Sequence, residues 1–224
     1  MTFIIALQLE DSIIVAADNQ GAIVMQDGSL AHQNDKASKL FAWSNGVITG
    51  AGEYTVIYRA IEFFIKTSKS KIEDLPKCLK ISRLIRELET QHTQIQTSKL
   101  LYSNCSKTGV QLYSIQPDGS GEYELKKCQQ NEIILWLFNP DFSAITTELK
   151  DLFINLRPYH SFNNQGDWIN YYINQLSQIY KIQAQVDLIM SQSFDVFFQN
   201  KDNYLFGHVP NIQDERLEFR EIFY

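Results

Sequence analysis

The residues best suited to chemistry stand at the two ends of an apolar hairpin near the N-terminus. Thr2 directly follows Met1 and opens an apolar segment, which we expect to form a strand over about residues 2–9. Removal of Met1 would leave Thr2 with a hydroxyl and a free α-amine, which together form a nucleophile and its base. A second apolar strand, expected over residues 12–18, ends on Asp18. Because the two ends of such a hairpin lie side by side, Asp18 can approach Thr2.

A carboxylate at the end of a buried strand needs a cation partner, and two lysines follow at suitable places. Lys36 precedes an apolar strand expected over residues 40–43, and Lys39 stands at the head of that strand. An ammonium group beside the α-amine of Thr2 would lower the pKa of that amine. Its ordinary pKa of about 7.7–8.0 is already close to what a general base needs. The residues themselves leave the choice between Lys36 and Lys39 open.

A glycine-containing turn follows the next strand, which is expected over residues 46–49. The turn reads Gly50-Ala51-Gly52-Glu53 and leads into an apolar helix that begins at about Tyr54. Glycine lets the backbone come close to a bound molecule, so the amides of this turn are free to face a ligand.

Length and composition restrict the class of protein. The chain has 224 residues, 44% of them hydrophobic and 21% charged, which is typical of a globular protein with one large core. We therefore expect a single domain over residues 1–224. The net charge of −6 argues against a nucleic-acid partner, because phosphate binding needs a concentrated basic surface. No apolar run is long enough for a membrane helix; one of the longest is only Ile133 to Phe138.

The cysteines and histidines suggest neither disulfides nor a metal. The three cysteines are widely spaced and odd in number: Cys78, Cys105 and Cys128. The four histidines are scattered, and no cluster has the spacing of a metal site. We therefore expect a reduced, cytoplasmic protein without a cofactor.

Periodicity places strands and helices in blocks along the chain. Besides the segments above, strands are expected at about 99–104, 110–115, 123–125, 133–138, 194–198 and 204–208, and helices at about 74–96, 139–156 and 167–182. Residues 19–38, which are rich in Gly, Asp, Gln and Asn, are expected to form a long hairpin or loop. This order favours an α+β protein with two mostly antiparallel sheets face to face and a helix pair on each outer side.

The order of the motifs resembles the N-terminal half of proteasome β-type subunits. These subunits belong to the N-terminal nucleophile (Ntn) hydrolases, whose bacterial relatives include a two-ring, ATPase-assisted peptidase. The resemblance rests on Thr2, on Ala16-Ala17-Asp18, on Lys39-Leu40-Phe41 and on the Gly-x-Gly-Glu turn. It covers about residues 2–65, with a weaker similarity near 187–205, and it implies the four-layer αββα sandwich of that family.

The resemblance also implies roles for individual residues. Thr2 would be the nucleophile and Asp18 the carboxylate that orients a catalytic lysine. Lys39 matches that lysine by its Lys-Leu-Phe context, and Lys36 is its rival. The amide of Gly50 would form the oxyanion hole, and Asp187 would support the threonine from the C-terminal half.

Two segments depart from the family pattern. Active members carry a Gly-Ser-Gly before the third helix, whereas here the segment at 135–139 is Leu-Trp-Leu-Phe-Asn. The Gly-Ser-Gly at 119–121 lies instead in an expected hairpin turn. A Ser-Gly expected after the supporting aspartate is replaced by Met190-Ser191.

These observations lead to three hypotheses. The first is a threonine-type peptidase that cleaves peptides or unfolded proteins inside a homo-oligomeric ring. The family resemblance also implies a possible ATPase partner. The second is a catalytically inactive proteasome-like subunit that acts as a ring scaffold or binding module. The third is an Ntn amidase that acts on a small amide.

Overall fold

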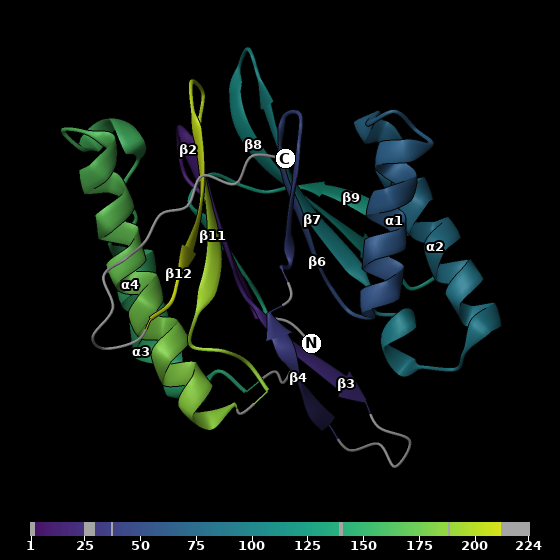
Figure 1. Cartoon of the computed structure of the whole chain (residues 1–224). Coiled ribbons are helices and arrows are strands. Elements are labelled where there is room, and N and C mark those ends of the chain that lie inside the picture. Colours follow the sequence, from purple (N-terminus) through teal and green to yellow (C-terminus); the bar gives the residue numbers. More distant parts are fainter. Residues whose placement is uncertain (1–2, 25–29, 37, 139–140, 188, 212–224) are drawn as a thin grey trace.

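The structure is a computed structural model that describes residues 3–24, 30–36, 38–138, 141–187 and 189–211 (Figure 1). The strands are β1 (Ile4–Gln8), β2 (Ser12–Asp18), β3 (Gln20–Val24), β4 (Leu30–Lys36), β5 (Leu40–Trp43), β6 (Gly46–Ala51), β7 (Lys99–Ser106), β8 (Gly109–Pro117), β9 (Tyr123–Lys127), β10 (Glu132–Trp136), β11 (Phe194–Asn200) and β12 (Tyr204–Val209). The α-helices are α1 (Tyr54–Lys66), α2 (Leu75–Glu89), α3 (Thr146–Ile154) and α4 (Gln165–Val186).

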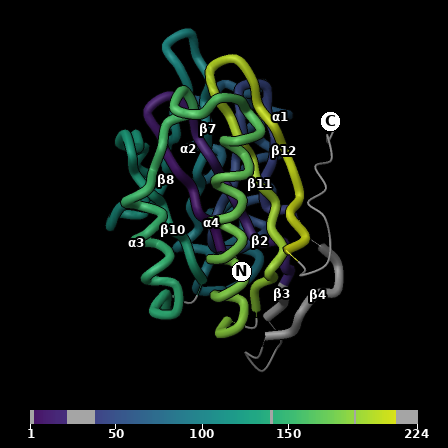
Figure 2. Tube along the Cα trace, turned by 90° about the vertical axis from the view of Figure 1, so that its left-hand side faces the viewer, coloured from purple at the N-terminus to yellow at the C-terminus, as the bar shows by residue number. Residues whose placement is uncertain are grey.

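The described strands form two five-stranded antiparallel sheets and a separate hairpin. The first sheet has the order β10-β1-β2-β11-β12 and the second the order β5-β6-β7-β8-β9. The sheets lie face to face, with α1 and α2 on one outer side and α3 and α4 on the other (Figure 1). Figure 2 shows α3 and α4 crossing the outer face of the first sheet. The predicted α+β fold, a four-layer αββα sandwich, is confirmed.

The first two strands are apolar throughout because both of their faces are buried. Side chains alternate between the faces of a strand, so Ile5 packs toward α3 and α4 while Ile4 packs between the sheets. The strand β2 divides in the same way, with Ile14 on the helix side and Val15 between the sheets. A third core cluster joins α1 and α2 to the outer face of the second sheet.

Helix boundaries differ from the expectation in two places. The helix expected over 74–96 ends at Glu89, and Thr90 is already extended (φ −160°). Thr90, His92 and Thr93 have weak helix propensity, and Thr93–Ile95 forms a separate 3₁₀ turn. The helix expected over 139–156 begins only at Thr146, after a 3₁₀ turn over Ser143–Ile145. The cap predicted at residues 139 and 140 lies outside the described residues.

Other sequence predictions agree with the structure. The segment 19–38 contains the hairpin of β3 and β4, and the Gly119-Ser120-Gly121 sequence lies in the turn between β8 and β9. The three cysteines are free thiols. No helix within the described ranges is long and apolar enough to cross a membrane.

Candidate active site

The beginning of β1 is tied to the end of β2 through Asp18. The backbone amide of Phe3 donates a hydrogen bond to Asp18 Oδ1 (2.8 Å), and the amide of Asp18 donates to the carbonyl of Phe3 (3.0 Å). The buried hydroxyl of Tyr180 in α4 donates to the same carbonyl (3.2 Å). The backbone at residue 3 is therefore fixed by the neighbouring strand β2 and by the helix layer.

Asp18 also holds a buried ammonium group. Lys39 Nζ lies 2.7 Å from Asp18 Oδ1, and the two side chains are only 9% and 1% exposed. The hydroxyl of Thr49 donates to the carbonyl of Lys39 (2.7 Å), which fixes the lysine backbone against β6. Burial lowers the pKa of Lys39, while the negative charges of Asp18 and Asp195 partly offset this effect. The carboxylate of Asp18 therefore counterbalances a charge that would otherwise be costly to bury.

A polar network lies beside the ion pair at one end of the first sheet, across β2, β11 and β12. Asp195 of β11 pairs in register with Ala17 of β2, and its Oδ1 lies 2.8 Å from His208 Nδ1. His208 Nδ1 also lies 3.1 Å from Asn19 Nδ2, and the amide of Asn19 donates to Ser191 Oγ (3.1 Å). The residue directly after Asp18 is thus bonded to β12 and to the loop that follows α4.

The end of β6 and the turn after it need glycine at two positions. The strand expected to end at residue 49 continues to Ala51, so Gly50 lies within β6, paired in register with Leu100, and not in the predicted turn. At Gly50 an added Cβ would lie 2.8 Å from the carbonyl oxygen of Lys99 and 2.8 Å from the side chains of Ile57 and Leu100. At Gly52 the backbone has φ +123°, and an added Cβ would lie 2.5 Å from Ser98 Cα. Close packing and a left-handed backbone explain these two glycines.

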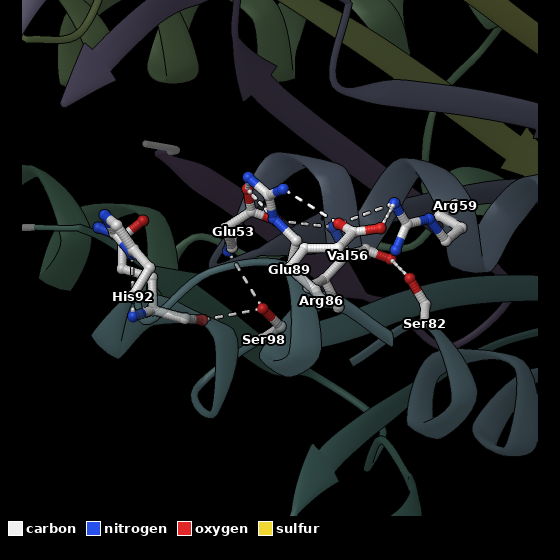
Figure 3. Close-up of polar contacts among 9 residues, drawn as sticks. Glu53, Val56, Arg59, Ser82, Arg86, Glu89, His92 and Ser98 are labelled. Carbon is white, nitrogen blue, oxygen red and sulfur yellow. Dashed lines mark hydrogen bonds and ion pairs between the residues drawn. The ribbon is translucent and has the colours of Figure 1, made fainter. Parts of the chain in front are cut away.

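A group of charged and polar side chains holds this turn to the helix layer (Figure 3). Glu53 caps α1 by accepting from the amide of Val56 (2.8 Å), and its own amide donates to Ser98 Oγ (3.1 Å). Arg86 of α2 binds Glu53 Oε1 through Nε and Nη2 (3.2 and 3.0 Å), and also contacts Glu89. The backbone that carries Gly50 is therefore anchored from α1, α2 and the segment before β7.

The structure brings together only some of the predicted site residues. Asp18 and Lys39 form an ion pair, and Gly50 adjoins Thr49, which binds the lysine backbone. Thr2 lies outside the described residues. Lys36 ends β4, where it pairs in register with Gln20, but its side chain lies outside the described part.

Asp187 forms hydrogen bonds that do not involve this ion pair. It is the C-terminal cap of α4, and its carboxylate accepts from the amide of Ile189 (3.2 Å). Within the described residues, its carboxylate makes no hydrogen bond or ion pair with Asp18 or Lys39.

Each of the two departures from the family pattern includes a large, buried apolar side chain. Trp136 ends β10, pairs in register with Ile4 of β1 and is 6% exposed. Met190 packs into the core beneath α4. Ser191, in contrast, lies against Asn19, so a serine hydroxyl does reach the residue next to Asp18.

Sequence reasoning missed the contacts of Asn19, Asp195 and His208. Asp195 offered a signal, because it is a carboxylate within an apolar strand. The register between β2, β11 and β12 creates these contacts, and no local pattern records it. Among the described residues, no group of three or more His, Cys, Asp or Glu side chains could hold a metal ion.

Two facing antiparallel sheets between helix pairs define a proteasome-like fold, and solved structures share this fold. The chain is similar to the Anbu protein in a helical assembly from Pseudomonas aeruginosa, with 13% identity, a TM-score of 0.67 and coverage of 95% of this chain and 88% of that one. It is similar to Anbu, an ancestral β-subunit, from Yersinia bercovieri, with 12% identity, a TM-score of 0.63 and coverage of 91% and 86%.

A third neighbour is HslV from Trypanosoma brucei, with 14% identity, a TM-score of 0.52 and coverage of 88% of this chain and 99% of that one. At these identities the likeness concerns the fold. No protein-family model and no curated protein sequence matches the chain.

Proposed function

We propose that this protein is a threonine-type peptidase of the proteasome-like class, with Thr2 as its nucleophile after removal of Met1. The observation that carries the proposal is the buried ion pair of Lys39 and Asp18, bonded to the backbone of Phe3 next to Thr2. A charged lysine is expensive to bury, and a purely structural strand end does not need one. Lys39 is therefore the preferred candidate for the catalytic lysine over Lys36.

The chemistry proposed is acyl transfer to the threonine hydroxyl, followed by hydrolysis. Thr2 Oγ attacks a peptide carbonyl while its proton passes to the α-amine, through a water molecule. The peptide C–N bond breaks with return of that proton to the leaving amine, and water then hydrolyses the ester. The ammonium of Lys39 favours the neutral amine and the developing alkoxide; at 4 Å such an interaction is worth about 4 kcal/mol at an effective dielectric of 20.

Two further residues complete the proposed machinery. The Gly50 amide would donate to the tetrahedral oxyanion, a contribution on the order of 10²–10³ in rate in comparable sites. Asp187 would act through the loop after α4, which reaches Asn19 at Ser191. The proposed substrates are peptides or unfolded proteins.

We propose that the protein forms a homo-oligomeric assembly in the cytoplasm and that this assembly can bind an ATPase partner. The Pseudomonas neighbour was solved as a helical assembly, which supports self-association. Three dispersed free thiols support a reducing compartment.

Replacement of the nucleophile tests the proposal directly. We expect Thr2→Ala to lose all peptide cleavage and all labelling by a threonine-directed electrophile, whereas Thr2→Ser keeps a measurable rate. Intact-protein mass spectrometry should show loss of Met1 and one added electrophile in the wild type. Undiminished cleavage by Thr2→Ala would disprove the proposal.

A second candidate function is a catalytically inactive subunit that acts as scaffold or binding module. The observation that favours it is the bulky Trp136 at the end of β10, where active relatives would have Gly-Ser-Gly. Retention of Met1 together with an absence of labelling would favour this function, because the α-amine would then not belong to Thr2.

A further inference from the structure

Lys99 places a second ammonium group on the inner face of the second sheet. It begins β7 and pairs in register with Ala51 of β6, one residue after Gly50. Side chains two residues apart lie on one face of a strand, and Leu101 packs between the sheets. Lys99 therefore points toward the first sheet and not toward α1 and α2.

The ammonium of Lys99 rests on the ring of Trp136. Nζ lies 4.5 Å from the ring centroid, a cation–π contact. Trp136 pairs with Ile4, so this contact flanks the beginning of β1 from the side of β10. The ion pair of Lys39 and Asp18 flanks the same place from the side of β2. Two ammonium groups therefore lie on either side of the strand that begins near Thr2.

The two lysines differ in their charge balance. Lys39 has a carboxylate at 2.7 Å, whereas Lys99 has no carboxylate within ion-pair distance among the described residues. Partial burial lowers the pKa of Lys99, and no neighbouring charge opposes this effect. An anion that reached Lys99 would meet a partly desolvated donor with no competing carboxylate among the described residues, where charge-assisted hydrogen bonds are strongest.

We propose that Lys99, seated on Trp136, is a specificity residue that pairs with a carboxylate of the peptide substrate. This inference rests on the proposed function and names its substrate class as acidic peptides. Adjacent strands lie about 4.8 Å apart and an extended peptide advances about 3.3 Å per residue. Trp136 pairs with Ile4, so Lys99 lies about one to two strand spacings from the beginning of β1. A peptide whose cleaved bond lies at that beginning therefore reaches Lys99 within two or three residues. The carboxylate is that of an acidic side chain or that of the peptide C-terminus.

Matched peptides test the proposal by cleavage. Pairs that differ only in Glu against Gln at one position are compared, each as the free C-terminal acid and as the amide. We expect the peptide with the carboxylate to have a kcat/KM at least about tenfold higher than its neutral counterpart in one of these two comparisons. A tenfold ratio corresponds to about 1.4 kcal/mol. In Lys99→Met this ratio should fall to about one, because methionine keeps an apolar stem over Trp136 without the charge. Lys99→Arg should retain it, and the exposed Lys127→Met is the control.

Binding separates this inference from the proposed peptidase activity. The same labelled peptides are titrated by fluorescence anisotropy into Thr2→Ala, with and without Lys99→Met. Tighter binding of the acidic peptide that depends on Lys99 supports the inference, even if the wild type cleaves nothing and the proposed function fails. Cleavage without a Lys99-dependent preference overturns the inference alone. Equal binding of Glu and Gln peptides to Thr2→Ala also overturns it.

Discussion

The most unusual side chain of the candidate site is a lysine that is almost completely enclosed. The hydrophobic effect alone would favour a nonpolar residue at position 39, because burying an ammonium is costly even beside a carboxylate. Asp18 lowers that cost with one oxygen that serves both Lys39 and the amide of Phe3. An ion pair that adds little to the stability of the fold is better explained by a catalytic role than by a structural one.

The effect of this ion pair on stability can be separated from its effect on cleavage. One variant removes the charge of Lys39 alone, and a second removes both charges. Lys39→Met leaves Asp18 buried without its cation, so we expect a loss of about 3–5 kcal/mol in the free energy of unfolding. The double variant Asp18→Asn with Lys39→Met removes both charges of the pair and should recover most of that loss in urea unfolding. Peptide cleavage should stay abolished in both. Full activity in the stable double variant would contradict a catalytic role for the pair, and the exposed Lys107→Met is the control.

Gly50 permits a second prediction about a single residue. In Gly50→Ala the new methyl would meet the Lys99 carbonyl at 2.8 Å, so the backbone must shift. We expect a loss of about 1–3 kcal/mol in stability and a lower kcat, although the amide itself remains. Gly119→Ala is a matched control, because nothing lies within 4 Å of its added Cβ. An unchanged melting temperature for Gly50→Ala would argue against the tight packing at the end of β6.

At the level of elements, the hairpin turn between β1 and β2 is held by one carboxylate. Asp11 accepts from the amides of Tyr159 and His160 (2.7 and 2.9 Å), just beyond α3. Its side chain therefore joins the first hairpin to the connection between α3 and α4.

The pH dependence of stability should report this contact. Burial raises the pKa of Asp11, but hydrogen bonds from His160 and Tyr159 outweigh it, so the pKa lies below the ordinary 3.8. A lowered carboxyl pKa stabilises the fold above about pH 4, and this contribution is lost as pH falls through the folded-state pKa. Asp11→Asn should cost about 1–2 kcal/mol at pH 7 and progressively less below pH 4 in urea unfolding. The exposed Asp202→Asn should show no such difference; a pH-independent gap for Asp11→Asn would contradict the assignment.

Much of the element order could be predicted because periodicity and turn residues are local. The apolar runs of β1 and β2, the spacing in α1 and the turn before β9 are all visible in the sequence. The end of α2 and the start of α3 were wrong because 3₁₀ turns are frequent near the ends of α-helices and are hard to tell from a continued helix in the sequence. In the site, Asp18 and its need for a cation were predicted from its place at a strand end. Its neighbour Asn19 was not, since its partners come from β12 and the loop after α4.

The four layers of the whole molecule leave apolar side chains on the outside. In α3, Phe153 and Ile154 are 60% and 77% exposed. Together with residues of β10 they line an apolar groove of about 420 Å³. Apolar surface of this kind is typical of proteins that associate.

We therefore expect the purified chain to form a homo-oligomer of several subunits. Light scattering coupled to size-exclusion chromatography should give a mass several times that of one chain at micromolar concentration. Assembly should persist in Thr2→Ala, because the nucleophile takes no part in it. A monomer at tens of micromolar would contradict the proposed oligomeric setting.

The position of β1 and β2 in the middle of their sheet has a consequence for synthesis on the ribosome. Their neighbours β10 and β11 are made much later; Asn19 and Ser191, which bond directly, are 172 residues apart. At 5–20 residues per second, roughly 10–35 s pass between synthesis of β2 and synthesis of its neighbour β11. During this interval an apolar, unpaired strand is open to chaperones and to other nascent chains, and a chain released before residue 194 would keep that edge exposed.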